Sequence, residues 1–407
     1  MPNILILGAS GLIGFSLAQS LLRSGNHTVV GLVRRSGQTS ILMQNEIYAV
    51  CADAGNEDAL KRVIEERRID VVVDAASAYE HAGLILDVVK QISEKRLREA
   101  GEWVCPKLGF VYVSLTELVL IMFWPNVLSV LLTLLDYQPR SLSALHHPLT
   151  VHPSHYCFYV SSILPRQTLC LLTVGIRTDF KPWQVSGVWV HGSPFDQTSD
   201  RILVGHPSNP SAPASATSWR PAHEQRILAS RDVLDVAIVR PSQVYGKGSW
   251  IFDTWWSPLL EAQEARKQGK GNKDQPTIQI PVSKEARTAV IHVDDVAAAL
   301  HAAIDQIEGR LGNWPVFDLV AETIRTTEII EAAMPVFDLD EGVEVQYVGT
   351  GDNPFFQAMG VRSNLDGARA TTVLGWTPKR REFLLGIGKY IMAWKAARKE
   401  KKAKEEK

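Results

Sequence analysis

The 407-residue sequence predicts an α/β protein built on a doubly wound, parallel Rossmann sheet, with a smaller C-terminal substrate-binding portion. Two observations lead to this fold class. Short apolar runs alternate with amphipathic helical stretches over residues 3–74, as in successive βαβ units. A glycine-rich turn follows the first apolar run directly, and the apolar fraction of 45% is that of a globular protein with a sizeable core.

The first strand is expected at residues 3–7, NILIL, and it runs straight into GASGLIG. Gly8 permits a tight turn, Gly11 leaves room for a pyrophosphate beside the backbone, and Gly14 lets the next helix pack close to the strand. The helix expected at 15–22 then directs its N-terminal amides at the phosphates. We therefore predict a dinucleotide-binding loop made of Gly8, Ser10, Gly11, Leu12, Ile13 and Gly14.

The second strand, expected at 28–33, ends at Arg34 and Arg35. A site selective for NAD places an acidic residue near this point, where it holds the adenosine ribose hydroxyls. Two guanidinium groups suit a 2′-phosphate instead, because arginine pairs with phosphate through a planar fork of donors. The sequence thus favours NADP as the cofactor, with NAD as the alternative.

Two more strands are expected at 47–51 and 70–74, separated by a helix at 57–67. Open α/β sheets bind ligands at the carboxyl ends of their strands. The further residues predicted to line the cofactor are therefore those that follow these strands, Asp53, Ala75 and Ala76.

Several segments together resemble the extended short-chain dehydrogenase/reductase superfamily, in its NAD(P)-dependent epimerase/dehydratase branch. They are GASGLIG, the Cys51–Asp53 segment, DAAS at 74–77, VRPSQVYGKG at 239–248, RTAVIHVDDVAAAL at 287–300 and SNLDGARATTVLGWTP at 363–378. The resemblance covers residues 3–114 and 187–392. It implies an enzyme that acts on a carbonyl, aldehyde or sugar-like small molecule, a cofactor contact from Arg240, and assembly as a homodimer.

The catalytic pair of that superfamily, a tyrosine with a lysine four residues later, is missing, because none of the nine tyrosines is followed by lysine at that spacing. The corresponding helix is expected at 216–230, where the family glutamate aligns with Glu224. Counting back places Arg220 at the lysine and Ala216 at the tyrosine. Arginine stays charged and is a poor proton relay. Arg220 and Ser186, which lies near the family hydroxyl position, are the candidate catalytic residues.

Four other polar residues have structural explanations that compete with catalysis. His191 stands where the family has a tyrosine, but a lone histidine in a loop is more often a packing or surface residue. Tyr245 matches a tyrosine that the family carries in addition to its catalytic one. Asp294 and Asp295 precede an alanine-rich helix, where an aspartate is expected as the N-cap.

The fifth strand is interrupted: LGFVYVS at 108–114 is its expected start and GVWVHG at 187–192 its continuation. The 72 residues between hold seven charged residues, against 80 in the remaining 335. We interpret 115–186 as an anomalous insertion foreign to the fold, for which translated intervening sequence is one origin. The predicted organisation is a Rossmann domain from 1–114 and 187–250, the insertion, a substrate-binding portion at 251–392 and a charged tail at 393–407.

Several partners are disfavoured. Residues 118–135 carry no charge and reach the minimum length of a membrane span, but Pro125 interrupts them and both flanks belong to a sheet strand, so membrane insertion is not expected. His146, His147, His152, His155 and Cys157 match no metal-ligand spacing, so no metal site is predicted. Near-neutral net charge argues against nucleic acid, and the lack of cysteine pairs and of a leader favours the cytoplasm.

Two functional classes remain. One is an NADP-dependent oxidoreductase or epimerase/dehydratase-like enzyme with an atypical proton donor, which the retained substrate-side motifs favour. The other is a catalytically inactive NAD(P)-binding sensor or regulatory protein, which the missing catalytic pair favours.

Overall fold

The computed structural model describes residues 1–76, 79–100, 107–113, 116–118, 183–185, 187–204, 206, 211–268, 277–339 and 342–405. Ser186 and most of the predicted insertion therefore lie outside the described residues. Contacts within the chain group Met1–Leu118 with Pro182–Lys407 in one compact unit, and all that follows concerns this unit.

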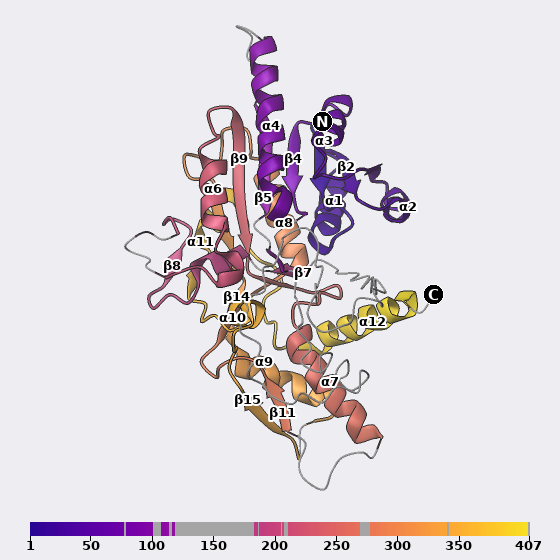
Figure 1. Ribbon diagram of the computed structural model, residues 1–407, viewed down its shortest axis with the longest axis vertical. Helices are drawn as coiled ribbons and strands as arrows, with labels where there is room; N and C mark the ends of the chain where they lie inside the picture. Colours follow the sequence, from indigo (N-terminus) through magenta and orange to yellow (C-terminus); the bar gives the residue numbers. More distant parts are fainter. Residues whose placement is uncertain are drawn as a thin grey trace, which may run out of the picture. The chain divides into compact units, whose positions relative to one another are not determined.

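A seven-stranded parallel sheet forms the centre of the unit (Figure 1). Its strands in spatial order are β13 (Val316–Leu319), β9 (Leu234–Pro241), β5 (Leu108–Val113), β4 (Val71–Asp74), β1 (Asn3–Leu7), β2 (Thr28–Val33) and β3 (Tyr48–Cys51). The order reverses direction at β1, since β2 and β3 lie on one side of it and β4 on the other. This is the strand order of a doubly wound Rossmann sheet, and the predicted fold class is confirmed.

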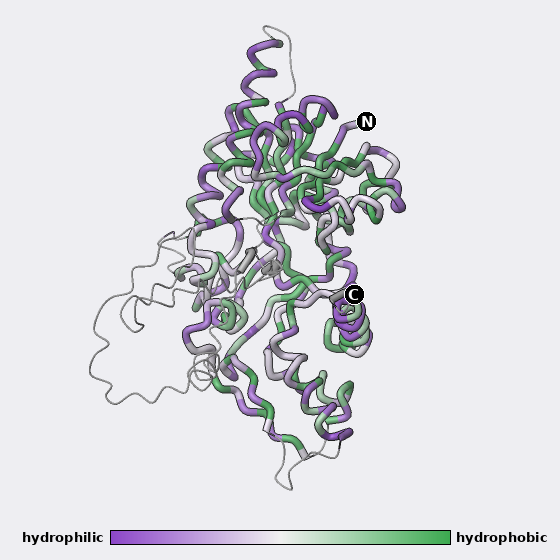
Figure 2. Tube along the Cα trace, turned by 45° about the vertical axis from the view of Figure 1, so that its right-hand side comes forward, coloured by the Kyte–Doolittle hydropathy of each residue, from purple (hydrophilic) through white to green (hydrophobic). Residues whose placement is uncertain are grey.

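Both faces of the sheet are buried, because successive side chains of each strand point to opposite faces. In β1, Ile4 and Ile6 join one core cluster, while Leu5 and Leu7 join the other. Helices α1 (Leu12–Ser24), α8 (Val293–Ile304) and α11 (Ala368–Leu374) cover the first face, and α3 (Glu57–Glu66), α4 (Tyr79–Ala100) and α6 (Arg220–Leu228) cover the second. Figure 2 shows the apolar stretches of chain gathered between these layers.

Helix ends follow the local sequence. α1 ends at Gly25, whose φ of 69° is left-handed, as is common for glycine after a helix. α3 begins after Asn56, whose side chain accepts a hydrogen bond from the backbone N–H of Ala59 at 2.9 Å. The sequence predicted these two helices within a few residues of their bounds.

The remaining elements lie mostly in the C-terminal part of the chain. The helices are α2 (Thr39–Gln44), α7 (Asp253–Lys267), α9 (Thr326–Ala333), α10 (Pro354–Met359) and α12 (Ile387–Glu405). Short strands form two small sheets, β10 (Gln243–Tyr245) with β12 (Arg287–His292) and β14 (Glu322–Arg325), and β11 (Thr277–Ile280) with β15 (Glu344–Tyr347). A two-residue pair joins β16 (Leu365–Asp366) to β8 (Thr198–Ser199). Single 3₁₀ turns occur at Ser36–Gln38 (η1), Gly187–His191 (η2), Ser215–Thr217 (η3) and Met334–Phe337 (η4).

The start of the predicted charged tail is part of a docked helix. Trp394 is 2% exposed, and the Arg398 guanidinium lies 3.0 Å from the Asp253 carboxylate of α7. α12 therefore continues across the predicted boundary at 393, and its first half packs against α7.

The predicted continuation of the fifth strand is wrong. β5 ends at Val113, and Gly187–His191 forms the 3₁₀ turn η2, all of it buried. The five residues are apolar enough for a strand, but they lie beyond the carboxyl end of β5 and pack on β9 and β13 instead of extending the ladder. Two short strands at the ends of the interruption, β6 (Thr116–Leu118) and β7 (Trp183–Val185), pair antiparallel, so Leu118 and Trp183 lie opposite each other.

The predicted aspartate cap of α8 is also wrong. His292 is the N-cap, and its Nδ1 accepts a hydrogen bond from the backbone N–H of Asp294 at 3.1 Å. Asp295 has a different structural task, because its carboxylate accepts the backbone N–H groups of Lys379 and Arg380. Asp294 pairs with Lys247 at 2.5 Å and with Arg380 at 2.8 Å.

Candidate functional site

The turn between β1 and α1 is bare of side chains at the points where the chain comes closest to itself. Gly8 has a φ of 75°, and a Cβ there would lie 2.8 Å from the carbonyl oxygen of Ala75. A Cβ on Gly14 would overlap the carbonyl oxygen of Gly8. The Gly11 N–H donates to the Gly8 carbonyl at 2.9 Å, which closes the turn. Only glycine fits at Gly8 and Gly14, so two of the three predicted roles have a direct steric basis.

The N-terminus of α1 has no anionic partner of its own. Gly11 is its N-cap, no side chain caps it, and its first turn contains no acidic residue. Ser10, Gly11 and Leu12 are half-buried at this end. Free amides and the positive end of the helix dipole favour an anion such as a diphosphate. The residues present thus fit the phosphates of a dinucleotide.

The predicted adenosine-side residues lie at the carboxyl ends of neighbouring strands. Arg34 and Arg35 are exposed directly after β2, and Asp53 is exposed just beyond β3. One carboxylate oxygen of Asp53 accepts the Gly55 N–H at 2.9 Å, so this side chain also shapes its own turn. Ala75, next to Gly8, is fully buried. The sheet brings these residues to the same edge as the glycine turn, as expected from parallel strands.

Arg220 lies in the core and not on a surface. It is fully buried at the start of α6, among Tyr112 of β5, Glu224 and Asp74 of β4, and burial lowers the pKa of its guanidinium. Burial raises the pKa of Asp74 to about 6, and the Arg220 charge only partly opposes that rise. Burial likewise raises the pKa of the Tyr112 phenol far above its ordinary value. The candidate lysine-position residue is therefore one member of a buried charged cluster.

The same cluster continues through Arg240, predicted to touch the cofactor. Its guanidinium contacts the Glu224 carboxylate at 2.5 Å and the Asp318 carboxylate at 3.4 Å, and all three side chains are at most 3% exposed. Burial would raise the pKa of Asp318, but its interactions and hydrogen bonds with His191 and Arg240 lower it. These pairings account for the charge of Arg240 within the protein.

The alternative proton donors named from the sequence are buried. His191 is completely inaccessible, and its Nε2 lies 2.7 Å from the Asp318 carboxylate. Tyr245 is 1% exposed, donates its hydroxyl to the carbonyl of Arg380 and stacks edge-on against His292 and Phe383. Among these residues the structure favours packing roles over direct contact with a substrate.

The buried carboxylates Asp74, Asp200 and Asp318 were not singled out from the sequence. Asp200 accepts the backbone N–H of Asp318 at 2.9 Å, and burial, together with the nearby Asp318 charge, raises the pKa of Asp200 to about 7. The sequence holds a signal for Asp74, since it ends the apolar strand VVVD and a carboxylate there must find a partner or lose its charge. Asp200 lies in a loop and gives no such signal.

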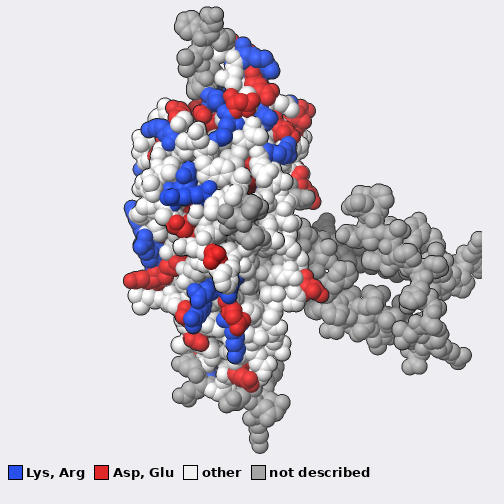
Figure 3. Space-filling model, turned by 90° about the vertical axis from the view of Figure 1, so that its left-hand side faces the viewer, with Lys and Arg blue, Asp and Glu red and all other residues white. Residues whose placement is uncertain are grey.

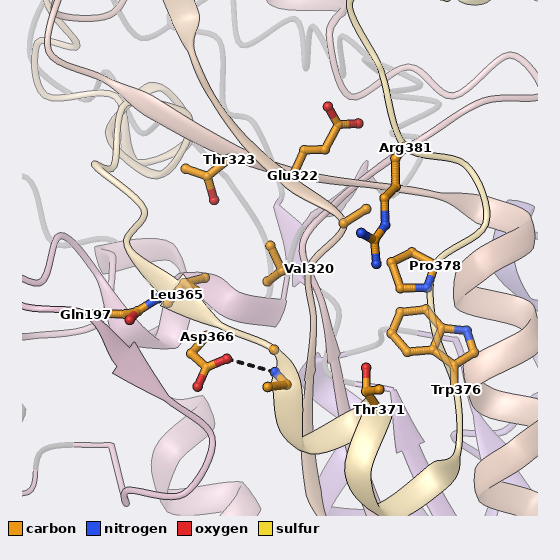
Figure 4. Close-up of a pocket in the computed structure, with 13 residues that line it drawn as sticks. Gln197, Val320, Glu322, Thr323, Leu365, Asp366, Thr371, Trp376, Pro378 and Arg381 are labelled. Atoms are coloured by element: carbon orange, nitrogen blue, oxygen red, sulfur yellow. Dashed lines mark hydrogen bonds between the residues drawn. The ribbon is translucent and has the colours of Figure 1, made fainter.

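A pocket of about 390 Å³ opens at the carboxyl end of β13. Val320, Glu322, Asp366, Trp376 and Arg381 are among its lining residues, and Figure 4 shows the Arg381 guanidinium directed toward Pro378 and Trp376. Three strands separate β13 from β1 in the sheet, so this pocket is distinct from the glycine turn.

The charges on one face of the molecule are of mixed sign. On the face drawn in Figure 3, Lys and Arg alternate with Asp and Glu without a large field of one sign. None of the helices in the described ranges is both long and apolar enough to cross a bilayer.

Comparisons with known proteins agree with this geometry. Residues 4–86 match the NAD dependent epimerase/dehydratase family. No curated protein matches the chain significantly.

Solved structures share the fold at low sequence identity. The dTDP-glucose 4,6-dehydratase of Bacillus anthracis, solved with NAD, is 14% identical, with 97% of each chain covered and a TM-score of 0.58. The UDP-glucuronic acid 4-epimerase of Bacillus cereus, solved with UDP-glucuronic acid and NAD, is 15% identical, with 97% of this chain and 99% of the other covered and a TM-score of 0.57. The UDP-glucose 4-epimerase of Thermus thermophilus, solved with NAD, is 14% identical, with 97% of this chain and 99% of the other covered and a TM-score of 0.56.

The resemblance drawn from the sequence is thereby confirmed: residues 4–86 carry the signature of the NAD-dependent epimerase/dehydratase family, on a Rossmann fold shared with sugar-nucleotide epimerases and dehydratases.

Proposed function

We propose that the protein is a nicotinamide-dinucleotide-dependent enzyme of the oxidoreductase or epimerase/dehydratase type, acting on a carbonyl-bearing, sugar-like small molecule. The observation that carries the proposal is the glycine turn, in which Gly8 and Gly14 pack too closely against the chain for a Cβ and which leads into the uncapped N-terminus of α1. Structural neighbours solved with NAD and with UDP-sugars supply the substrate class by analogy of fold.

In this proposal the α1 amides and the Gly11 backbone hold the diphosphate, and Asp53 and Ala76 border the adenosine. Arg34 and Arg35, both exposed, would pair with a 2′-phosphate and select NADP over NAD. The nicotinamide supplies hydride exchange with a carbonyl carbon. Arg220 stabilises the carboxylate of the buried Asp74 at the end of β4. Ser186 remains a candidate for orienting the substrate oxygen.

The cofactor preference is testable with charge-reversed variants. Titration of the protein with NADPH and NADH, followed by fluorescence, is expected to give tighter NADPH binding. Arg35→Glu is expected to weaken NADPH at least tenfold and to leave NADH nearly unchanged, because only the first carries the extra phosphate. Arg67→Glu, at the exposed end of α3, is the matched control. Equal losses for both cofactors would contradict the assignment to NADP.

A second candidate is a catalytically inactive dinucleotide sensor. The observation that favours it is the burial of Arg220 among Asp74, Tyr112 and Glu224, where the family lysine would serve proton transfer. Incubation with bound cofactor and a panel of sugar nucleotides, aldehydes and ketones separates the two, with products followed by NMR so that epimerisation without net oxidation is detected. Turnover of any panel member supports the enzyme, whereas tight binding with no turnover supports the sensor.

Location in the cytoplasm and assembly as a homodimer remain predictions. Cell fractionation and light scattering of the full chain test them. The interpretation of 115–186 as an insertion foreign to the fold also remains a prediction. The antiparallel pairing of β6 with β7 favours it, because a deletion between them joins neighbouring backbone. A chain that lacks residues 119–181 should then fold with unchanged dinucleotide affinity.

A further inference from the structure

Two histidines and one aspartate from distant parts of the sequence meet where α1 and α8 end. His27 lies between α1 and β2, His301 is in the last turn of α8, and Asp305 is the C-cap of α8. The His27 Nε2 is 3.0 Å from one Asp305 oxygen, and the His301 Nε2 is 3.5 Å from the other. One ligand atom from each of the three residues lies within 4.8 Å of the others.

These separations are those of metal ligands. Zinc binds imidazole nitrogen and carboxylate oxygen at about 2.0–2.2 Å, so neighbouring ligand atoms in a tetrahedral site are about 3.3 Å apart. Two nitrogen–oxygen distances lie near this value: the His27 Nε2 is 3.0 Å from Asp305 Oδ1, and the His301 Nε2 is 3.5 Å from Asp305 Oδ2.

A serine hydroxyl lies at the Nδ1 of each histidine, where a hydrogen bond would orient the imidazole so that its Nε2 can bind a metal. The Ser24 hydroxyl donates to the Leu21 carbonyl at 2.7 Å, so its oxygen accepts from the His27 Nδ1, which is 3.2 Å away. The His27 Nε2 faces a carboxylate oxygen of Asp305 at 3.0 Å, so an imidazole with its proton on Nδ1 offers this nitrogen as a metal ligand. The Ser20 hydroxyl lies 3.0 Å from the His301 Nδ1, within hydrogen-bond distance of the second ring nitrogen. Metal-bound histidines characteristically bond their second ring nitrogen in this way.

The local field also favours a cation. α1 and α8 both terminate at the cluster, and the C-terminus of a helix carries partial negative charge. Asp305 adds a full negative charge at the C-cap of α8, where a carboxylate is otherwise unfavourable. His27 is 3% and His301 16% exposed, whereas Asp305 is 49% exposed.

We propose that His27, His301 and Asp305 bind one divalent transition-metal ion, of which zinc fits best, with the fourth position open to water. The ion would fasten α8 to the end of α1, the helix that carries the glycine turn. Softness and geometry support zinc, because two imidazoles and one carboxylate in a tetrahedral arrangement suit it better than magnesium or calcium.

The test compares two matched variants of the full chain, Asp305→Asn and Asp87→Asn. Asp87 is an aspartate of similar exposure, 54%, that pairs with Arg226 on α4 and α6, far from the cluster in sequence. Each protein is stripped with a chelator and then titrated with ZnCl₂ against a competing fluorescent chelator. Zinc held by histidines outside the described residues contributes equally to both variants, so the difference reports on this site alone.

We expect Asp87→Asn to bind one more equivalent of zinc than Asp305→Asn, or the same equivalent at least tenfold more tightly. Loaded with Co²⁺, Asp87→Asn should show the absorption bands of tetrahedral cobalt, whereas Asp305→Asn should not. Ser24→Ala, which removes the hydrogen bond to His27, should weaken zinc about tenfold. Equal zinc stoichiometry and affinity in the two aspartate variants would overturn the proposal and leave a purely ionic His–Asp cluster.

Discussion

The substitution Gly8→Ala isolates the steric requirement of the dinucleotide turn when it is compared with Gly25→Ala. Both glycines have left-handed backbone, with φ values of 75° and 69°, and both flank the same helix, α1. They differ in what an added Cβ would meet. At Gly8 the nearest atoms are the Ala75 oxygen at 2.8 Å and the Ala76 Cα at 2.9 Å, whereas nothing lies within 4 Å at Gly25.

The expected loss in free energy of unfolding has two parts, the strain of a left-handed backbone and the steric overlap of the added Cβ. A left-handed alanine costs roughly 1–2 kcal/mol, and this is the whole expected loss in the free energy of unfolding for Gly25→Ala. Gly8→Ala carries the same strain and adds backbone overlap, which costs about 1–3 kcal/mol when a packed site must move. The total is about 2–5 kcal/mol. The shift of the turn also moves the α1 amides, so NADPH affinity should fall at least tenfold.

Urea denaturation of the two variants measures the loss in free energy of unfolding, and titration with NADPH measures the change in affinity. Gly25→Ala should keep the affinity of the unaltered protein, because its strain lies at the far end of α1. Similar stability and similar affinity in the two variants would refute the reasoning, since it would mean that the approach of Gly8 to Ala75 neither limits packing nor shapes the phosphate site.

Three further predictions concern buried charge. The pKa of Asp74 is raised from 3.8 to about 6, so folding takes up a proton between these values. Stability falls by about 2 kcal/mol as pH rises from 4 to 6, and by about 3 kcal/mol in all from well below pH 3.8 to well above pH 6. Asp74→Asn should flatten this part of a pH–stability curve measured with urea. Burial lowers the pKa of His292 to about 4, so its imidazole stays neutral in the folded protein down to about that pH; the stability this contributes is complete above pH 6.5 and is lost as pH falls to 4. His292→Asn should therefore be more stable than His292→Ala by about 1 kcal/mol in thermal unfolding at pH 7. Glu224→Gln should lose about 3–5 kcal/mol in urea, because Arg240 then keeps a buried charge with only the more distant Asp318 carboxylate beside it.

Local patterns in the sequence accounted for much of the Rossmann half. The first strand and the glycine turn were predicted from an apolar run followed by GASGLIG, and both are where expected. The helix at 57–66 follows from its Leu60, Val63 and Ile64 stripe, whose members are all buried. These signals are reliable because the side-chain period and the steric demand of a glycine act within a few residues.

Predictions that depended on residues distant in the sequence were less accurate. His292 caps α8 where an aspartate was expected, because Lys247 and the Lys379–Arg380 backbone engage the two aspartates. GVWVHG has strand-like composition, but η2 forms since β5 stops at Val113. The cofactor contact expected of Arg240 stays a prediction, although Glu224 and Asp318 already neutralise its charge.

The sequence by itself determined the class of fold and the place of the dinucleotide turn, because both depend on short-range periodicity and on the absence of side chains at fixed spacing. Tertiary structure alone decided which ionisable groups are buried together. Arg220 meets Asp74, and His27 meets His301 and Asp305, only when strands and helices distant in sequence become neighbours in the sheet. Electrostatic interaction depends on distance and burial, and neither is encoded in the local pattern of residues.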